Sequence, residues 1–318
     1  HVRSLLPNPG APLRRENRAI LAPSSKPGIA QRCVHDAQNK MLLPGIKVRV
    51  EGQPATGDPA VDEAYEALGA SYDFFWKVLG RDSIDNNGFA LIGSVHYGQG
   101  YENAFWNGAQ MVFGDGDGEI FQRFTRSLDV IAHELAHGVT ESEAGLIYAN
   151  QSGALNESLS DVFGVLTKQY SLSHTAEQAD WLIGADLLMP QIHGQGLRSM
   201  SHPGTAYDDP LLGKDPQPDH MRKFVITTED NGGVHINSGI PNRAFYLAAR
   251  TLGGFAWEKA GRIWYDTLCD KRLSHDATFE AFAELTVENA GKRFGAREVT
   301  AVREAWAQVG IELVVEVV

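Results

Sequence analysis

The stretches DVIAHELAHGVT at residues 129–140 and SGALNESLSDVFG at residues 152–164 decide how this chain is built. Both have the apolar spacing of a helix, which predicts helices over residues 129–141 and 153–170. His133 and His137 are four positions apart, about one helical turn, so both imidazoles can reach one metal ion. Glu134 lies between them, where its carboxylate can face a water molecule on that metal. This spacing is typical of zinc hydrolases.

The second stretch supplies groups that the two histidines lack. A catalytic zinc site has three protein ligands and one open position, and Glu157 on the second helix is the candidate third ligand. Asp161 and Asn156 are suited to accept hydrogen bonds from the ligand imidazoles and to fix their tautomers. Two imidazoles and one carboxylate favour zinc, although cobalt or manganese could replace it in vitro. A structural zinc site would need a fourth protein ligand, and none is evident.

The composition is that of an acidic globular protein. The 318 residues carry a formal net charge of −12, and 43% of them are hydrophobic, which suggests about two domains with sizeable cores. Lys and Arg are scattered without a basic stripe, which argues against nucleic-acid or membrane-surface partners. No apolar run reaches the roughly 18 residues of a membrane span. Cys33 and Cys269 could pair, but two buried free thiols are the favoured interpretation.

The first half of the chain is predicted to be rich in strands. Residues 1–30 are rich in Pro, Arg and Ser, which indicates an extended arm, a linker or the remnant of a processed leader. The chain does not begin with Met, so we expect an upstream piece to have been removed. Strands are predicted within residues 31–57 and 89–121, with a helix over residues 59–80 between them. The sequence GDGDG at residues 114–118 predicts a hairpin turn, because it does not match an EF-hand loop.

The second half is predicted to be helical. A loop rich in Gly, Pro and Asp over about residues 190–235 precedes predicted helices at 241–252, 256–270 and 276–309, the last broken near Gly295. Strands first and helices later indicate an α+β fold with two lobes, and the metal-binding helix falls at their junction, where clefts commonly form. The expected parts are an arm or propeptide remnant at 1–30, a β-rich lobe at 31–149 and a helical lobe at 150–318.

From about residue 31 onward the chain resembles the thermolysin family of secreted zinc endopeptidases. Beyond the two stretches above, the resemblance is carried by SVHYGQGYENAFWNGAQMVFGDGDG (94–118), GLIY (145–148), LRSM (197–200) and DNGGVHINSGIPNRAFY (230–246). The forms NESLSDVFG, PGTAYDDP, GKDPQP and SGIPNRAFYLA look most like the short-propeptide branch, which includes protealysin and grimelysin. The resemblance implies a two-lobed fold with the active-site cleft between a β-rich lobe and a helical lobe.

The resemblance also implies a role for each matching residue. The zinc ligands would be His133, His137 and Glu157, the general base Glu134, and the hydrogen-bond partners of the histidines Asp161 and Asn156. Donors to the developing oxyanion would be Tyr148 and His235, with Asp230 orienting His235. Substrate would be held by Arg198, by the strand edge at Asn103 and Ala104, and by a pocket lined by Phe121, Phe124, Val130 and Leu197.

The implied activity is that of a neutral endopeptidase that cleaves polypeptides before bulky hydrophobic residues, outside the cell. Two alternatives are a latent zymogen, in which the chain's own N-terminal propeptide covers the site, and a zinc aminopeptidase. The aminopeptidase is disfavoured because the G-x-M-E-N motif is absent. The family's double calcium site is not expected, because Lys168, Leu182 and Ala185 stand where acidic ligands would be needed beside Asp129, Asp180 and Asp186. A single calcium elsewhere stays open.

Overall fold

The computed structural model describes residues 26–313, so residues 1–25 of the predicted arm and residues 314–318 lie outside the described part. The helices are α1 (Pro59–Leu79), α2 (Leu128–Ser142), α3 (Asn150–Leu172), α4 (Asp230–Asn237), α5 (Gly239–Leu252), α6 (Ala260–Leu268), α7 (Phe279–Arg293) and α8 (Ala296–Gln308), with 3₁₀ turns η2 (Phe124–Arg126) and η3 (Met221–Lys223). Every helix predicted from the sequence is present, and Gly295 separates α7 from α8.

The N-terminal part contains one five-stranded mixed sheet. Its spatial order is β2-β1-β3-β5-β4, and the strands are β1 (Arg32–Asp36), β2 (Ile46–Val50), β3 (Leu91–Val95), β4 (Ala104–Trp106) and β5 (Met111–Phe113). The central strands β1, β3 and β5 are parallel, whereas β2 and β4 pair antiparallel at the two edges. The edge strand β4 therefore leaves one row of backbone groups without a strand partner among the described residues.

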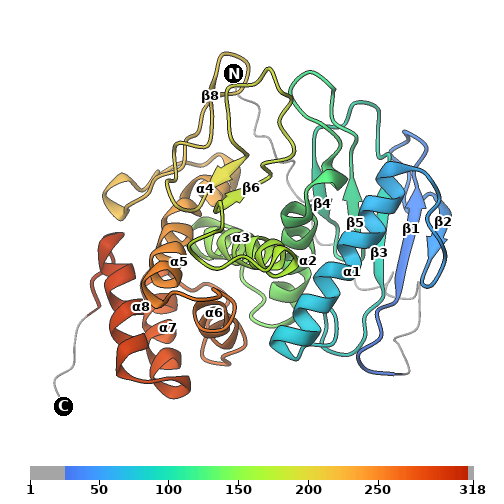
Figure 1. Cartoon of the computed structure of the whole chain (residues 1–318). Helices are drawn as coiled ribbons and strands as arrows, with labels where there is room; N and C mark the ends of the chain where they lie inside the picture. The colour runs from blue at the N-terminus through green and yellow to red at the C-terminus, as the bar shows by residue number, and fades with distance from the viewer. Residues whose placement is uncertain (1–25, 314–318) are drawn as a thin grey trace.

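Helix α1 covers this sheet (Figure 1), and its local sequence explains both of its ends. The Asp58 side chain accepts hydrogen bonds from the N–H groups of Ala60 and Val61, and Pro59 fits the first turn. Gly80 adopts φ 69°, a left-handed conformation that ends the helix. The helical prediction over residues 59–80 is confirmed.

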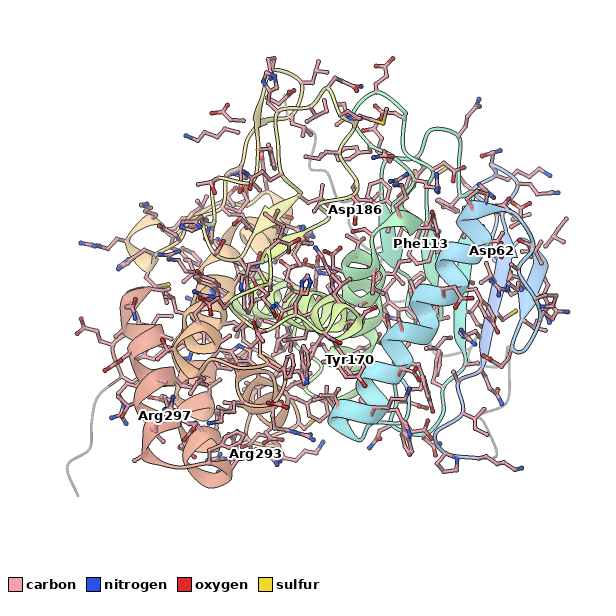
Figure 2. The ribbon with its side chains drawn as sticks, viewed as in Figure 1. Asp62, Phe113, Tyr170, Asp186, Arg293 and Arg297 are labelled. Carbon is pink, nitrogen blue, oxygen red and sulfur yellow. The ribbon has the colours of Figure 1, made fainter. Side chains whose placement is uncertain are left out.

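Helices α2 and α3 pack against each other at the centre of the molecule, between the sheet with α1 and the bundle α5–α8 (Figure 1). Residues 152–167 of α3 are buried without interruption, because α3 packs against α1, α2, α4 and α5. Tyr170, labelled in Figure 2, lies near the end of α3. Its ring contacts that of Phe74 of α1 edge-on, with centroids 5.9 Å apart. The predicted α+β class with a sheet-containing part followed by a helical part is confirmed.

The connection between α3 and α4 is long and largely irregular. It contains two small two-stranded ladders, β6 (Leu182–Ile183) with β7 (Arg198–Ser199) and β8 (Asp208–Asp209) with β9 (Gly213–Lys214). This agrees with the predicted loop at about residues 190–235, except that α4 already begins within it.

The segment GDGDG at 114–118 forms a turn but not the predicted hairpin. Strand β5 ends at Phe113, and both of its edges are already taken by β3 and β4. Asp117 instead accepts hydrogen bonds from the backbone N–H groups of residues 119, 120 and 121, at 3.0, 2.8 and 2.9 Å. This side-chain bonding closes a local turn and directs the chain away from the sheet.

Cys33 and Cys269 are both free; Cys33 is buried and Cys269 is partly exposed. No helix within residues 26–313 has the length and apolarity needed to cross a membrane.

Candidate active site

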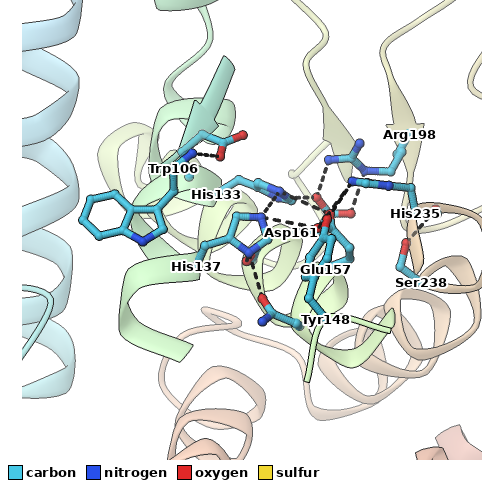
Figure 3. Close-up of polar contacts among 12 residues, drawn as sticks. Trp106, His133, His137, Tyr148, Glu157, Asp161, Arg198, His235 and Ser238 are labelled. Carbon is cyan, nitrogen blue, oxygen red and sulfur yellow. Dashed lines mark hydrogen bonds and ion pairs between the residues drawn. The ribbon is translucent and has the colours of Figure 1, made fainter. Parts of the chain in front are cut away.

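The three predicted metal ligands meet where α2 and α3 pack (Figure 3). The Nε2 atoms of His133 and His137 lie 3.0 Å apart, and each is 3.4 Å from one carboxylate oxygen of Glu157. One ligand atom from each residue falls within 4.8 Å of the others, and no further such group of ligating side chains occurs among the described residues. Two imidazoles and one carboxylate, with no fourth ligand within residues 26–313, match a zinc site with an open position.

The other imidazole nitrogens have hydrogen-bond partners that fix the rings. His133 Nδ1 lies 2.8 Å from Asp161 Oδ1, and His137 Nδ1 lies 2.7 Å from Asn156 Oδ1 and 3.1 Å from Ser160 Oγ. A proton held at Nδ1 leaves the Nε2 lone pairs directed at the common point.

The buried charges of the site favour a bound cation. Burial raises the pKa of Glu157, but the neighbouring histidines outweigh this effect and hold that pKa well below its usual value. Burial lowers the pKa of His133, but hydrogen bonds to Asp161 and Glu157 outweigh it and raise the pKa to about 10. The pKa of His137 shifts in the opposite direction, because burial lowers it to about 4. The buried carboxylates of Asp161 and Glu157 thus keep the His133 imidazole protonated. A divalent cation bound at the site would balance their negative charge in place of that proton.

Glu134 is 5% exposed and lies beside the ligands without joining them. Its Oε2 accepts a hydrogen bond of 3.0 Å from the backbone N–H of Trp106 in β4. Burial raises the pKa of Glu134 to about 7. A carboxylate with that pKa can take up and release a proton near neutral pH.

Arg198, which the sequence analysis expected to hold the substrate, forms an ion pair with Asp161. Its Nε and Nη2 atoms donate to the two oxygens of Asp161, at 2.8 and 2.7 Å, and Asn242 Nδ2 donates to the same carboxylate at 2.8 Å. The Arg198 guanidinium, against the opposing effect of burial, holds the pKa of Asp161 below its usual range. Asp161 therefore stays ionised and keeps His133 in place.

Tyr148, His235 and Asp230 form a connected row beside Glu157. The Tyr148 hydroxyl donates to Glu157 Oε1 and lies 3.0 Å from His235 Nε2. His235 Nδ1 lies 2.5 Å from Asp230 Oδ1, and the His235 backbone N–H donates to Asp230 Oδ2 at 2.9 Å. Burial raises the pKa of Tyr148 well above its usual value, so the hydroxyl remains a proton donor.

The predicted substrate edge coincides with β4. Ala104 begins this edge strand, and Asn103 immediately before it is 4% exposed. The Asn103 Nδ2 group is buried and has no hydrogen-bond partner among the described residues. A buried donor without an acceptor is costly, which is consistent with an acceptor that arrives with a ligand.

The four residues predicted to line a pocket are brought together only in part. Phe121 and Phe124 contact each other with ring centroids 5.7 Å apart, and both, like Val130, are buried in the main core. Leu197 is partly exposed, packs against the same core and directly precedes Arg198.

Several polar groups of the site were missed by the sequence analysis: the Trp106 backbone N–H, Ser160, Asn242 and Gln217. Ser160 lies four residues after Asn156 on the same helix, a spacing that could have identified it. Asn242 and Gln217 come from distant segments, and a backbone donor carries no residue-type signal at all.

Lys168 stands at a position where the family's double calcium site would need an acidic ligand. Its ammonium lies 3.1 Å from Asp129 Oδ2 and 3.0 Å from Asp180 Oδ2, and it donates to the Leu182 carbonyl at 3.4 Å. Burial opposes the charge, but the two aspartates outweigh it and raise the pKa of Lys168.

Helix α2 carries the HExxH motif, and α3 packs on it and brings Glu157 to the two histidines. This arrangement defines a metallohydrolase with a His-His-Glu centre. Comparison with known proteins gives the particular family. Residues 48–141 match the model of the thermolysin metallopeptidase catalytic domain, and residues 144–311 match its alpha-helical domain. The chain belongs to the thermolysin family and is a metalloendopeptidase, a hydrolase of peptide bonds.

Individual relatives agree. An extracellular metalloprotease of Pectobacterium carotovorum is 67% identical over 286 residues, which is 90% of this chain and 82% of the relative. The structure of a precursor of protealysin from Serratia proteamaculans superimposes with a TM-score of 0.90 at 64% identity, covering 92% of this chain and 91% of that one. A thermolysin from a Bacillus strain is 41% identical over 288 residues, but the match spans 50% of its length. The predicted protealysin branch is confirmed.

Proposed function

We propose that this metalloendopeptidase cleaves peptide bonds on the N-terminal side of bulky hydrophobic residues, with zinc held by His133, His137 and Glu157. The observation that carries the proposal is the convergence of a buried carboxylate, Glu134, and two proton donors, Tyr148 and His235, around these ligands. When bound there, zinc supplies a Lewis acid that polarises the peptide carbonyl and acidifies the attacking water.

The chain's own residues would move the proton. Glu134, whose pKa burial raises to about 7, takes a proton from the attacking water and passes it to the leaving amine. Tyr148 and His235 donate hydrogen bonds to the negative charge that develops on the carbonyl oxygen. One such donor typically contributes about 3 kcal/mol to lowering the barrier.

The substrate would bind as an added strand on the free edge of β4, where Asn103 Nδ2 provides a donor. The side chain after the scissile bond would enter a pocket formed by Leu197 with Phe121, Phe124 and Val130. Arg198 uses the N–H of Nε and one N–H of Nη2 for Asp161, so the N–H groups of Nη1 and the second N–H of Nη2 would be left to contact the substrate carbonyl.

The test of the base is the Glu134→Gln variant, assayed on an N-blocked peptide. We expect kcat to fall about 100- to 10,000-fold because proton transfer is lost, while bound zinc stays stoichiometric. Glu284→Gln, at an exposed position of α7, is the matched control and should retain activity. Near-normal turnover by Glu134→Gln with zinc bound would disprove the assignment.

The two alternatives have separate tests. An aminopeptidase would prefer peptides with a free amino terminus, so equal or better cleavage of N-blocked peptides excludes it. A latent zymogen would gain activity when residues 1–30 are removed, and the relation to a protealysin precursor supports making that measurement.

We further propose secretion, because the relatives from Pectobacterium and Serratia marcescens are named extracellular proteases. The lobes are proposed to meet between residues 149 and 150, where the chain enters α3. The region around Lys168 is proposed not to bind calcium, because the ammonium already neutralises Asp129.

A further inference from the structure

The segment GKDPQP at residues 213–218 matched the protealysin branch in sequence, and its Gln217 reaches the backbone beside the active site. Gln217 Nε2 donates to the carbonyl oxygen of His235 at 2.7 Å and to the Ser238 hydroxyl at 3.0 Å. The Ser238 hydroxyl in turn donates to the same His235 carbonyl at 2.9 Å. Gln217 is 6% exposed and Ser238 is fully buried, so water does not compete for these bonds.

His235 stands at the end of a backbone segment that needs external support. Residues 230–233 all have positive φ, at 51°, 51°, 86° and 78°. Two of them, Asp230 and Asn231, are not glycine, so the left-handed conformation is strained there. This turn is what lets Asp230 reach both the N–H and the imidazole of His235. Strained backbone persists only when surrounding contacts determine it.

Gln217 is itself held rigidly. Its backbone N–H donates to Asp215 Oδ1 at 3.0 Å, and the other oxygen of this 4%-exposed carboxylate accepts from Gly204 N and Ala206 N, each at 3.0 Å. The side chain also packs closely on the start of α5, since a Cβ at Gly239 would lie 3.0 Å from the Gln217 Cβ. The Gln217 amide is therefore held in the position from which it donates to the His235 carbonyl.

We propose that Gln217 is a positioning residue for His235: it fixes the backbone of His235 so that the imidazole meets the transition state at the correct place. Asp230 holds the imidazole of His235, whereas Gln217 and Ser238 hold its backbone carbonyl. The side chain and the backbone of His235 are therefore both fixed. The inference rests on the proposed role of His235 as an oxyanion donor.

The experiment compares Gln217→Met and Gln217→Glu with the parent enzyme, each zinc-loaded and checked for an unchanged thermal midpoint. Gln217→Met keeps roughly the volume of the side chain but donates no hydrogen bond, and Gln217→Glu replaces the amide donor by a carboxyl group that donates only when it is protonated. We expect kcat to fall about three- to tenfold, the effect of one lost neutral hydrogen bond, with KM nearly constant. Binding of a phosphinate peptide, a tetrahedral analogue, should weaken by the same factor, whereas binding of a product peptide should not change.

A matched control and a double-mutant cycle make the test decisive. Gln191→Met removes another glutamine amide that donates to a backbone carbonyl, that of Glu119 at 2.6 Å, away from the site, and should leave kcat unchanged. In the His235→Ala background Gln217→Met should have no further effect on kcat. An equal fall in that background, or a change in KM alone, would overturn the proposal. If His235→Ala itself leaves kcat intact, the oxyanion assignment is what fails.

Discussion

Replacing Lys168 by Met should destabilise the protein, because Lys168 is the charged partner of a buried carboxylate. Asp129 has a 1% exposed side chain, and the Lys168 side chain is 15% exposed. Asp129 also accepts hydrogen bonds from the Ser127 hydroxyl and the Gly184 N–H, but both donors are neutral. Asp180 is 45% exposed and can be solvated by water once the lysine is gone.

The magnitude follows from the buried partner. Removing one member of a buried ion pair costs about 3–5 kcal/mol, and the two neutral donors that Asp129 keeps place the loss near the lower end, about 3 kcal/mol. With an unfolding entropy of about 2 cal/mol/K per residue, that loss lowers the Tm of a chain of this length by about 5 °C. Lys77→Met is the control, because Lys77 pairs with Asp73 on the surface of α1, where such pairs contribute little.

The assay is thermal unfolding of the zinc-loaded protein, with and without millimolar calcium. Calcium should raise the Tm of the parent less than that of Lys168→Glu, since the Lys168 ammonium already compensates Asp129. Lys168→Glu should lose stability, and calcium should restore part of it because the cluster gains a hard oxygen ligand. A calcium-induced rise in Tm that is no larger for Lys168→Glu than for the parent would refute the reasoning, as would equal Tm values for Lys168→Met and Lys77→Met.

Two more predictions concern histidines that are held by neighbouring aspartates. Asp161→Ala should weaken zinc binding about 10- to 100-fold, measured by chelator competition, because His133 loses the partner that orients it; unchanged affinity would contradict this. His96 bridges Asp115 and Asp58, and the hydrogen bond to Asp115 raises its pKa to about 9. Its contribution is complete below about pH 6.5 and is lost as pH rises through about 9. The Tm difference between the parent and His96→Gln should therefore shrink from pH 6 to pH 10; a constant difference would rule this out.

The elements of this fold could be predicted where the signal is local. Helix α1 begins after Asp58 and ends at Gly80 because both caps act within a few residues of the helix. The same holds for the break at Gly295. The turn at 114–118 was predicted as a hairpin and is not one, because whether a turn joins two paired strands depends on which strands already occupy the edges of β5.

The sequence by itself predicted the candidate metal ligands: helical periodicity puts His133 and His137 on one face of α2, and Glu157 was the candidate third ligand on the next predicted helix. The packing of α2 on α3 then brings Glu157 to the two imidazoles. Only the tertiary structure decided what holds that centre in place. Asn242 meets Asp161 from 81 residues away, and the Trp106 backbone N–H meets Glu134 from another element. Helical spacing is a property of neighbouring residues, whereas such contacts depend on how separate elements pack, and a backbone donor is the same in every residue except proline.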